Sequence, residues 1–129
     1  MSIYEKKLSI VIPAYNEGER IYENLLEMSK LLSSFVTDYE MIVVNDGSKD
    51  NTEVEIRRAS ETVKNIVPAG YQMNRGKGGA IKEGVKCATG DYIAFLDADM
   101  DLSPMHLKDF LAKMEDQPTG RRFAPGNRR

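Results

Sequence analysis

Three short apolar segments set the strongest limit on how this chain can fold. They are residues 8–12 (LSIVI), 41–44 (MIVV) and 92–96 (YIAFL). Each is almost continuously apolar and rich in β-branched or aromatic residues, a pattern typical of strands covered on both faces. The segments are too short to be buried helices, so they predict the centre of a parallel sheet between helices. A weaker fourth strand is expected near residues 65–68.

Helical patterns occupy the stretches between these segments. Apolar residues recur at steps of three and four from Ile21 to Phe35, from Ile81 to Ala88 and from Leu107 to Met114. Asp50, with Glu53 three residues later, predicts a capping box at the start of a further helix. Strands that alternate with helices predict βαβ units with right-handed crossovers. The expected fold class is therefore α/β, a Rossmann-like three-layer sandwich with a mostly parallel sheet.

The chain is long enough for one domain with a substantial core. It has 129 residues, of which 41% are hydrophobic and 29% charged, and this balance excludes a wholly disordered chain. We expect a domain over residues 1–116. Residues 117–129 contain four arginines, two prolines and two glycines, which predicts a basic, disordered tail.

Net charge, cysteine content and hydropathy limit the possible partners and cellular compartment of the protein. The net charge is −2, so no overall basic field exists to bind nucleic acid. The single cysteine, Cys87, excludes an intrachain disulfide framework and suits a reducing compartment. No apolar run approaches the roughly 18 to 20 residues that span a bilayer. We therefore expect a cytoplasmic protein without a transmembrane segment.

Polar residues follow each predicted strand directly. In an open parallel sheet, ligands bind beyond the carboxyl ends of the strands. Those positions hold residues 13–17 (PAYNE), 45–48 (NDGS) and 97–101 (DADMD). Three acidic clusters are therefore expected to converge on one edge of the sheet.

The segment Asp97-Ala98-Asp99 is the strongest single sign of chemistry. Carboxylates at this spacing beyond a strand can bind one divalent cation, because magnesium usually takes one or two carboxylates plus phosphate oxygens. Such a cation would neutralise a diphosphate and help it to leave. The alternative is a pair of solvated loop acids, since a lone D-x-D is common by chance.

Two further segments fit the same edge. A carboxylate at Asp46 can accept hydrogen bonds from a nucleobase or ribose, although residues 45–48 are also typical of a turn. Residues 74–79 (NRGKGG) open the third helix, where glycines let the backbone approach a phosphate while Arg75 and Lys77 add positive charge. A flexible turn with a solvated lysine is the alternative. This segment is not a Walker loop, because glycine follows Lys77.

Four segments in this order resemble the family 2 glycosyltransferases of the GT-A fold: SIVIPAYNE, VVNDGSKDNT, NRGKGGA and GDYIAFLDAD. The chain is most similar to the dolichyl-phosphate mannose and glucose synthase group, over about residues 7–114. The resemblance implies an inverting transfer of a sugar from a UDP- or GDP-sugar to a lipid phosphate or glycan acceptor. It also implies a magnesium or manganese cofactor.

The resemblance further implies which residues bind the sugar donor. Nucleotide binding is implied for Pro13, Ala14, Tyr15, Glu17, Asp46, Arg75, Lys77, Asp97 and Ala98. Asp46 would hold the base, and Arg75 or Lys77 would lie near the diphosphate. The implied metal ligands are Asp97, Asp99 and Asp101. No residue stands out as the general base, so that role is unassigned.

Two departures from the family pattern affect this interpretation. The second motif usually carries two aspartates, and here the first is Asn45. Family members usually continue well beyond the last expected helix, and the continuation carries the acceptor site. We therefore expect the nucleotide-sugar-binding half of such an enzyme, with weak or absent turnover of its own. An uncovered sheet edge would favour a homodimer.

Two other classes of protein remain. One is a nucleotide- and metal-binding module without independent transferase activity. The other is a sugar-phosphate nucleotidyltransferase, which is expected to carry a glycine-rich phosphate loop after the first strand, where residues 13–17 do not supply one. With a lipid-phosphate acceptor, the protein would work peripherally at the cytoplasmic face of the membrane.

Overall fold

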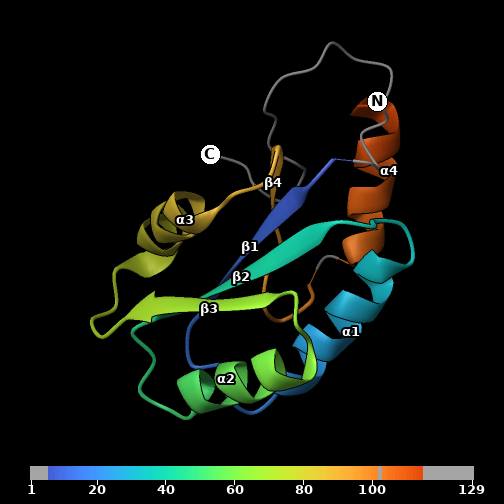
Figure 1. Cartoon of the computed structure of the whole chain (residues 1–129). Coiled ribbons are helices and arrows are strands. Elements are labelled where there is room, and N and C mark those ends of the chain that lie inside the picture. Colours follow the sequence, from blue (N-terminus) through green and yellow to red (C-terminus); the bar gives the residue numbers. More distant parts are fainter. Residues whose placement is uncertain (1–5, 102, 115–129) are drawn as a thin grey trace.

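The chain folds into three layers in the computed structural model, which describes residues 6–101 and 103–114 (Figure 1). The strands are β1 (Leu8–Ala14), β2 (Tyr39–Asp46), β3 (Ile66–Tyr71) and β4 (Tyr92–Phe95). The helices are α1 (Ile21–Ser33), α2 (Thr52–Thr62), α3 (Gly76–Cys87) and α4 (Pro104–Met114). The four strands are parallel, in the order β3-β2-β1-β4. This confirms the expected α/β sandwich.

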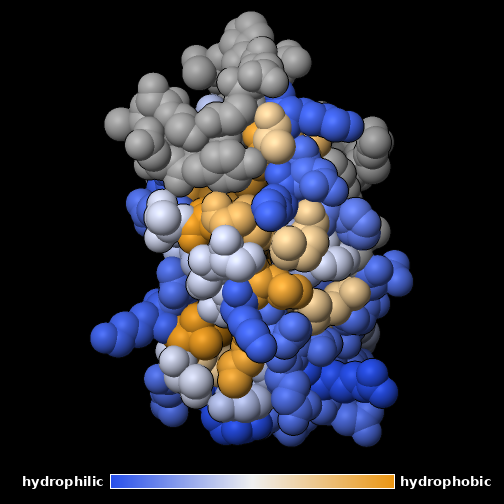
Figure 2. All heavy atoms as spheres, turned by 90° about the vertical axis from the view of Figure 1, so that its right-hand side faces the viewer, coloured by the Kyte–Doolittle hydropathy of each residue, from blue (hydrophilic) through white to orange (hydrophobic). Residues whose placement is uncertain are grey.

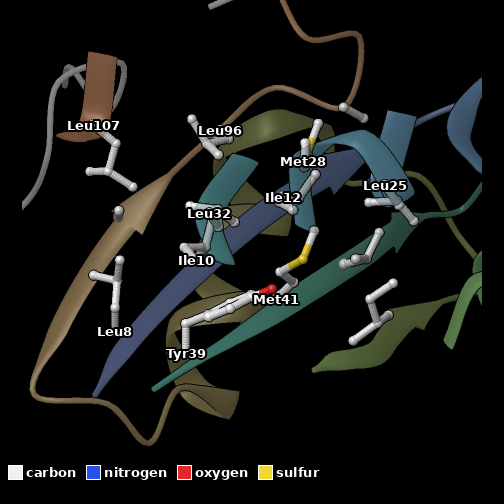
Figure 3. Packing of buried hydrophobic residues seen from close by; sticks show 14 of the residues in the cluster. Leu8, Ile10, Ile12, Leu25, Met28, Leu32, Tyr39, Met41, Leu96 and Leu107 are labelled. Atoms are coloured by element: carbon white, nitrogen blue, oxygen red, sulfur yellow. The ribbon is translucent and has the colours of Figure 1, made fainter. Parts of the chain in front are cut away.

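The central strands bury side chains on both faces of the sheet. Because successive side chains of a strand point to opposite faces, Met41 and Val43 of β2 pack toward α1, α2 and α4. The alternate residues Ile42 and Val44 pack toward α3. All four are fully buried, and Figure 3 shows Met41 among the side chains of the larger cluster. Burial on both faces is the physical reason for the unbroken apolar run in the sequence.

The fourth strand exists and is longer than expected. Within the described residues β3 pairs with β2 alone, which makes it an edge strand. Pro68 lies within β3, and an edge strand tolerates proline because its missing N–H need not enter a ladder. The register places Gly70 opposite Asn45 and Tyr71 opposite Asp46, so the carboxyl ends of β2 and β3 lie side by side.

Side-chain hydrogen bonds fix the starts of α4 and α2. The α4 helix begins at Pro104, and the backbone N of Met105 donates to Ser103 Oγ over 3.1 Å, as expected of a cap. The capping box at Asp50 is wrong, because the residue before α2 is Asn51 and its side chain makes no capping bond. The Asp50 carboxylate instead accepts hydrogen bonds from the backbone N of Thr52 and of Gly18. It thereby ties the start of α2 to the loop after β1.

Two expectations concern parts of the chain beyond this core. The tail over residues 117–129 lies outside the described residues. Of the helices in the described part, none combines the length and the apolar character that crossing a membrane requires.

Candidate functional site

A hollow of about 370 Å³ opens at the carboxyl edge of the sheet, and we call it the edge hollow. It is lined by Pro13, Ala14, Tyr15, Glu17, Asp46, Asn74, Gly76, Lys77 and Asp97. These residues lie at or just beyond the carboxyl ends of the four strands, or at the start of α3, as the rule for parallel sheets predicts. Seven of the nine residues predicted to bind a nucleotide therefore lie around one hollow, and the exceptions are Arg75 and Ala98.

Asp46 is the best-defined side chain of the edge hollow. It is 3% exposed, and three protein groups hold its carboxylate. The Tyr71 hydroxyl donates to Oδ1 over 2.5 Å, and the backbone N of Arg75 donates to the same oxygen over 2.8 Å. Asn74 Nδ2 donates to Oδ2 over 2.9 Å and to the Asp46 carbonyl over 3.0 Å. Asp46 thus fixes the segment between β3 and α3 against the end of β2.

Gly47 allows the end of β2 to lie close to the segment between β3 and α3. Its φ of 67° lies in the left-handed region, which a residue with a side chain adopts at a cost. A Cβ at this position would lie 2.3 Å from the backbone N of Asn74. Glycine is therefore required for two reasons, and the turn after Asp46 is part of the site's construction.

A cation and a carboxylate face each other across the edge hollow. Lys77, in the first turn of α3, donates from Nζ to Asp97 Oδ1 over 3.0 Å. Both side chains are partly exposed, at 58% and 37%, so water screens the pair and it adds little to stability. Because the ion pair between Lys77 and Asp97 costs little to separate, Lys77 is available to a ligand anion.

The two exceptions lie just outside the edge hollow. The Arg75 guanidinium stacks on the Tyr71 ring, with Cζ 3.9 Å from the ring centroid, and lies 3.9 Å from Glu83 Oε1. Its contribution to the hollow is the backbone N that binds Asp46. Ala98 is buried, and its carbonyl accepts a hydrogen bond from Asn24 Nδ2 of α1 over 3.0 Å. This bond fixes the loop after β4 to α1.

The predicted metal ligands are only partly gathered. Asp97 lines the edge hollow, whereas Asp99 and Asp101 are exposed on a turn in which the backbone N of Asp101 donates to Asp99 Oδ1 over 2.9 Å. Among the described residues, no group of three or more His, Cys, Asp or Glu side chains is arranged to hold a metal ion. A cation here would therefore take one or two carboxylates and complete its shell with ligand oxygens, as magnesium commonly does.

The negative charge of the acidic side chains near Glu17 and Asp97 suits a divalent cation. Burial raises the pKa of the Glu17 carboxyl above its usual range. The charge of Asp99 raises it further, and those of Asp50 and Asp97 add to the effect. The carboxylates therefore repel one another, and their oxygens are the hard ligands that magnesium and manganese prefer. The chemistry of these oxygens suits such a cation, although the described residues alone do not form a complete metal site.

The sequence did not single out Tyr71 and Asn74. Both follow or end β3, the strand predicted least securely, so the rule that polar residues gather beyond strand ends could not be applied there. The position of Asn74 at the start of the glycine-rich segment was the only available signal.

A parallel sheet of this order, with an acidic loop after β4 and a glycine-rich helix start at the same edge, defines an α/β domain of the GT-A type. The chain belongs to glycosyl transferase family 2, whose sequence model matches residues 9–124.

Solved structures with the same fold include enzymes that act on sugars. The mannosyltransferase PcManGT from Pyrobaculum calidifontis, in complex with GDP-Man and Mn2+, is 29% identical over 75% of this chain, with a TM-score of 0.67. TarS residues 1–349 from S. aureus is 29% identical over 85% of the chain, with a TM-score of 0.67. Glucosyl-3-phosphoglycerate synthase from Mycobacterium tuberculosis is 23% identical over 87%, with a TM-score of 0.67, and supports the fold alone. The chain spans 28%, 32% and 40% of these structures, respectively.

Proposed function

We propose that the edge hollow binds the nucleoside diphosphate of a sugar donor, and that this domain contributes donor binding to an inverting glycosyltransferase. The observation that carries the proposal is the convergence of Asp46, Lys77 and Asp97 on one hollow beyond the strands. Membership of the family supports it. So does the complex of PcManGT, a similar structure, with GDP-Man and Mn2+.

Each side chain of the edge hollow has a defined task in this proposal. Asp46 accepts a hydrogen bond from the base, because a carboxylate can take about four donors and the protein supplies three to its oxygens. Tyr15, 43% exposed, offers its ring to the nucleoside. Lys77 moves from Asp97 to the diphosphate, and the start of α3 adds the favourable end of the helix dipole.

Asp97 and Asp99 are the proposed ligands of a magnesium or manganese ion, with Asp101 as a further oxygen ligand. When bound, this cation neutralises the charge that develops on the leaving diphosphate. The acceptor oxygen attacks the anomeric carbon as the bond from that carbon to the diphosphate oxygen breaks, which inverts the configuration.

The acceptor decides whether a base is needed. A lipid phosphate is already ionised and attacks without losing a proton, whereas a glycan hydroxyl must transfer its proton to a base within hydrogen-bond reach. No residue of the edge hollow is assigned as that base, and a lipid phosphate would not require one. With such an acceptor, the protein would work at a membrane surface.

Binding and turnover are separate questions for a chain that spans 28% to 40% of the solved structures compared above. The test is a panel of UDP-glucose, UDP-N-acetylglucosamine and GDP-mannose with Mn2+ or Mg2+, in which binding and sugar transfer to dolichyl phosphate are measured in parallel. Cation-dependent binding of one donor supports the proposed site, and transfer supports a complete enzyme. Binding without transfer indicates a donor-binding module, and no binding of any donor contradicts the proposal.

A further inference from the structure

A second cavity, of about 520 Å³, lies between α2 and the edge strand β3, and we call it the α2–β3 cavity. It is lined by Asn45, Ser48, Glu53, Ile56, Arg57, Pro68, Ala69, Gly70, Tyr71 and Gln72. None of these residues lines the edge hollow. Its volume lies within the range of about 300–1,000 Å³ that is usual for small-molecule sites.

The pleat of β2 separates the two cavities. Neighbouring residues of a strand point to opposite faces, so Asp46 lines the edge hollow and Asn45 lines the α2–β3 cavity. Gly70, the partner of Asn45 on β3, lines this cavity without adding a side chain to it. A Cβ at Gly70 would lie 2.5 Å from the Asn45 carbonyl oxygen, so the packing of the two strands requires glycine there.

Asn45 directs a hydrogen-bond donor into this cavity. The residue is 8% exposed, and its Oδ1 accepts a hydrogen bond from the backbone N of Ser48 over 3.1 Å. Its Nδ2 has no acceptor among the described residues. No fully buried side-chain nitrogen or oxygen of the described residues lacks a partner, so Nδ2 reaches the surface of the cavity that the residue lines.

The remaining polar groups of the cavity are neutral or balanced in charge. Ser48 Oγ accepts from the backbone N of Asn16 over 2.9 Å, which leaves its proton available to donate. The exposed Gln72 offers a side-chain amide. Arg57 Nε and Glu53 Oε2 lie 3.3 Å apart, so their charges compensate. Nucleotides and phosphates, which require excess positive charge, are therefore poor candidates.

Apolar groups complete the lining. Ile56 of α2 is almost fully buried, and Pro68 of β3 is exposed at the strand edge. A ligand for this cavity needs several neutral oxygens for Asn45, Ser48 and Gln72, and a C–H face for the apolar wall. An uncharged sugar ring has both properties, and the paired charges of the rim can also bind hydroxyl groups.

We propose that the α2–β3 cavity is a binding site for an uncharged sugar ring, such as one unit of a glycan. This site is distinct from the proposed nucleotide site and does not depend on it. Both cavities lie at the end of the β2–β3 pair. The short segment after β3 contributes Gln72 to the α2–β3 cavity and Asn74 to the edge hollow.

The test is a titration of the full chain, labelled with 15N, by methyl α-glucopyranoside, methyl α-mannopyranoside, maltose and inorganic phosphate. We expect one of the neutral sugars to shift the side-chain amide signals of Asn45 and Gln72 saturably, with a Kd of about 1–10 mM, equivalent to weak binding. The absence of such shifts up to about 50 mM sugar, well above that range, would overturn the proposal. So would shifts of these signals by phosphate alone.

Two variants test the assigned groups. Asn45→Asp keeps the oxygen that accepts from Ser48 and removes the donor, and aspartate is the usual family residue here, so the fold should tolerate it. Gln72→Ala removes the exposed amide without touching β2. Each is expected to weaken the sugar about threefold or more, as the loss of one hydrogen bond implies. The control is Lys64→Gln, on an exposed residue outside the cavity lining. Unchanged affinity in both variants would overturn the assignment.

Discussion

Asp46 joins the end of β2 to the start of α3 through three donors at its carboxylate, from Tyr71, Asn74 and Arg75. The Asp46 carboxylate is buried among these donors. Replacing one of its oxygens by an NH2 group would therefore place that group against one of the three donors, with no acceptor between them. The residue therefore has two roles that must be separated by experiment: it holds the segment after β3, and it is the proposed acceptor for the base.

Asp46→Asn is expected to lower the free energy of unfolding by about 1–3 kcal/mol, because a donor in this network loses its acceptor. The same variant is expected to weaken nucleoside binding even under chelator, because the proposed contact to the base needs no metal. Urea unfolding and calorimetry measure the two effects. Tyr71→Phe separates them, since it removes one donor and keeps the carboxylate.

The control for Asp46→Asn and Tyr71→Phe is Asp38→Asn, on an exposed residue before β2. Nucleoside affinity equal to that of wild type in Asp46→Asn would refute the proposed contact to the base. An unchanged unfolding free energy would refute the structural role.

At the residue scale, sequence reasoning identified the site residues at the ends of the strongly apolar strands. Pro13 and Asp46 end apolar strands and Asp97 follows one, and each lines the edge hollow. Tyr71 and Asn74 were missed because their importance comes from contacts to Asp46, which depend on the β2–β3 register. That register cannot be predicted from a strand whose own pattern is weak.

At the element scale, α3 begins within the glycine-rich segment, and its distance from the sheet is set by Gly84. A Cβ at Gly84 would lie 2.3 Å from Val11 Cγ1 of β1. The helix can approach β1 this closely only without a side chain there. The position of Lys77 over Asp97 therefore depends on a small residue two turns along the helix.

Gly84→Ala is expected to displace α3 and to destabilise the fold by about 1–3 kcal/mol through overpacking. The matched control is Gly78→Ala on the same helix, where a Cβ would meet nothing within 4 Å. Alanine there should be neutral or stabilising by up to about 1 kcal/mol, because it favours the helix. Thermal unfolding of both variants checks this, and equal melting temperatures would contradict the packing account.

The opposite end of the sheet is held by Glu40. Its Oε2 accepts from Ser9 Oγ over 2.6 Å and from the backbone N of Thr89 over 2.8 Å. Burial alone would raise the pKa of this carboxyl, but the bonds from Ser9 and Thr89 and the charge of Lys7 lower it below 4.5. The folded state thus favours the ionised carboxylate, and this stabilisation is present above the unfolded pKa.

We predict that this stabilisation is lost as the pH falls below about 4.5 and through the lowered folded pKa. Glu40→Gln should be less stable than wild type at pH 7, and the difference should shrink as the pH falls. Urea midpoints measured from pH 7 to pH 3 give this comparison, with Glu61→Gln on exposed α2 surface as the control. A difference that stays constant or grows toward acid pH would contradict the assignment.

The strands that are buried on both faces were the ones that the sequence predicted. The runs that became β1, β2 and β4 are buried on both faces, and this leaves few choices but apolar residues. The strand β3 is half exposed and contains Pro68 and Gly70, so its pattern resembles a loop. The capping box at Asp50 was wrong because the carboxylate accepts from the backbone N of Thr52, only two residues on, and from that of Gly18, a tertiary contact that no local pattern records.

At the scale of the whole molecule, one face carries a concentration of apolar side chains. Figure 2 shows them on the side formed by α1 and α4. Among the partly buried apolar residues of this layer are Tyr22, Leu26 and Phe110. Apolar surface of this kind is commonly covered by another surface.

The homodimer expected from the sequence remains a prediction. Sedimentation equilibrium at micromolar concentration should give about twice the mass of 14.5 kDa, with Leu26→Glu shifting the equilibrium toward monomer because it places a charge on an apolar contact. Arg57→Glu, on the exposed side of α2, serves as the control for added negative charge. A wild-type monomer across the concentration range would refute self-association.

The central claim is that the edge hollow binds a nucleoside diphosphate together with a divalent cation. Calorimetric titration of the full chain with UDP and with GDP, in Mn2+ and then in chelator, tests it most directly. We predict that one nucleotide binds in Mn2+, and that chelation or Asp97→Asn weakens it about tenfold or more, since a metal ligand is lost. Asp109→Asn, on exposed α4 surface, should bind as wild type does. Failure of both nucleotides to bind in Mn2+ would contradict the claim. So would binding in chelator, or by Asp97→Asn, that is as tight as the binding of wild type in Mn2+.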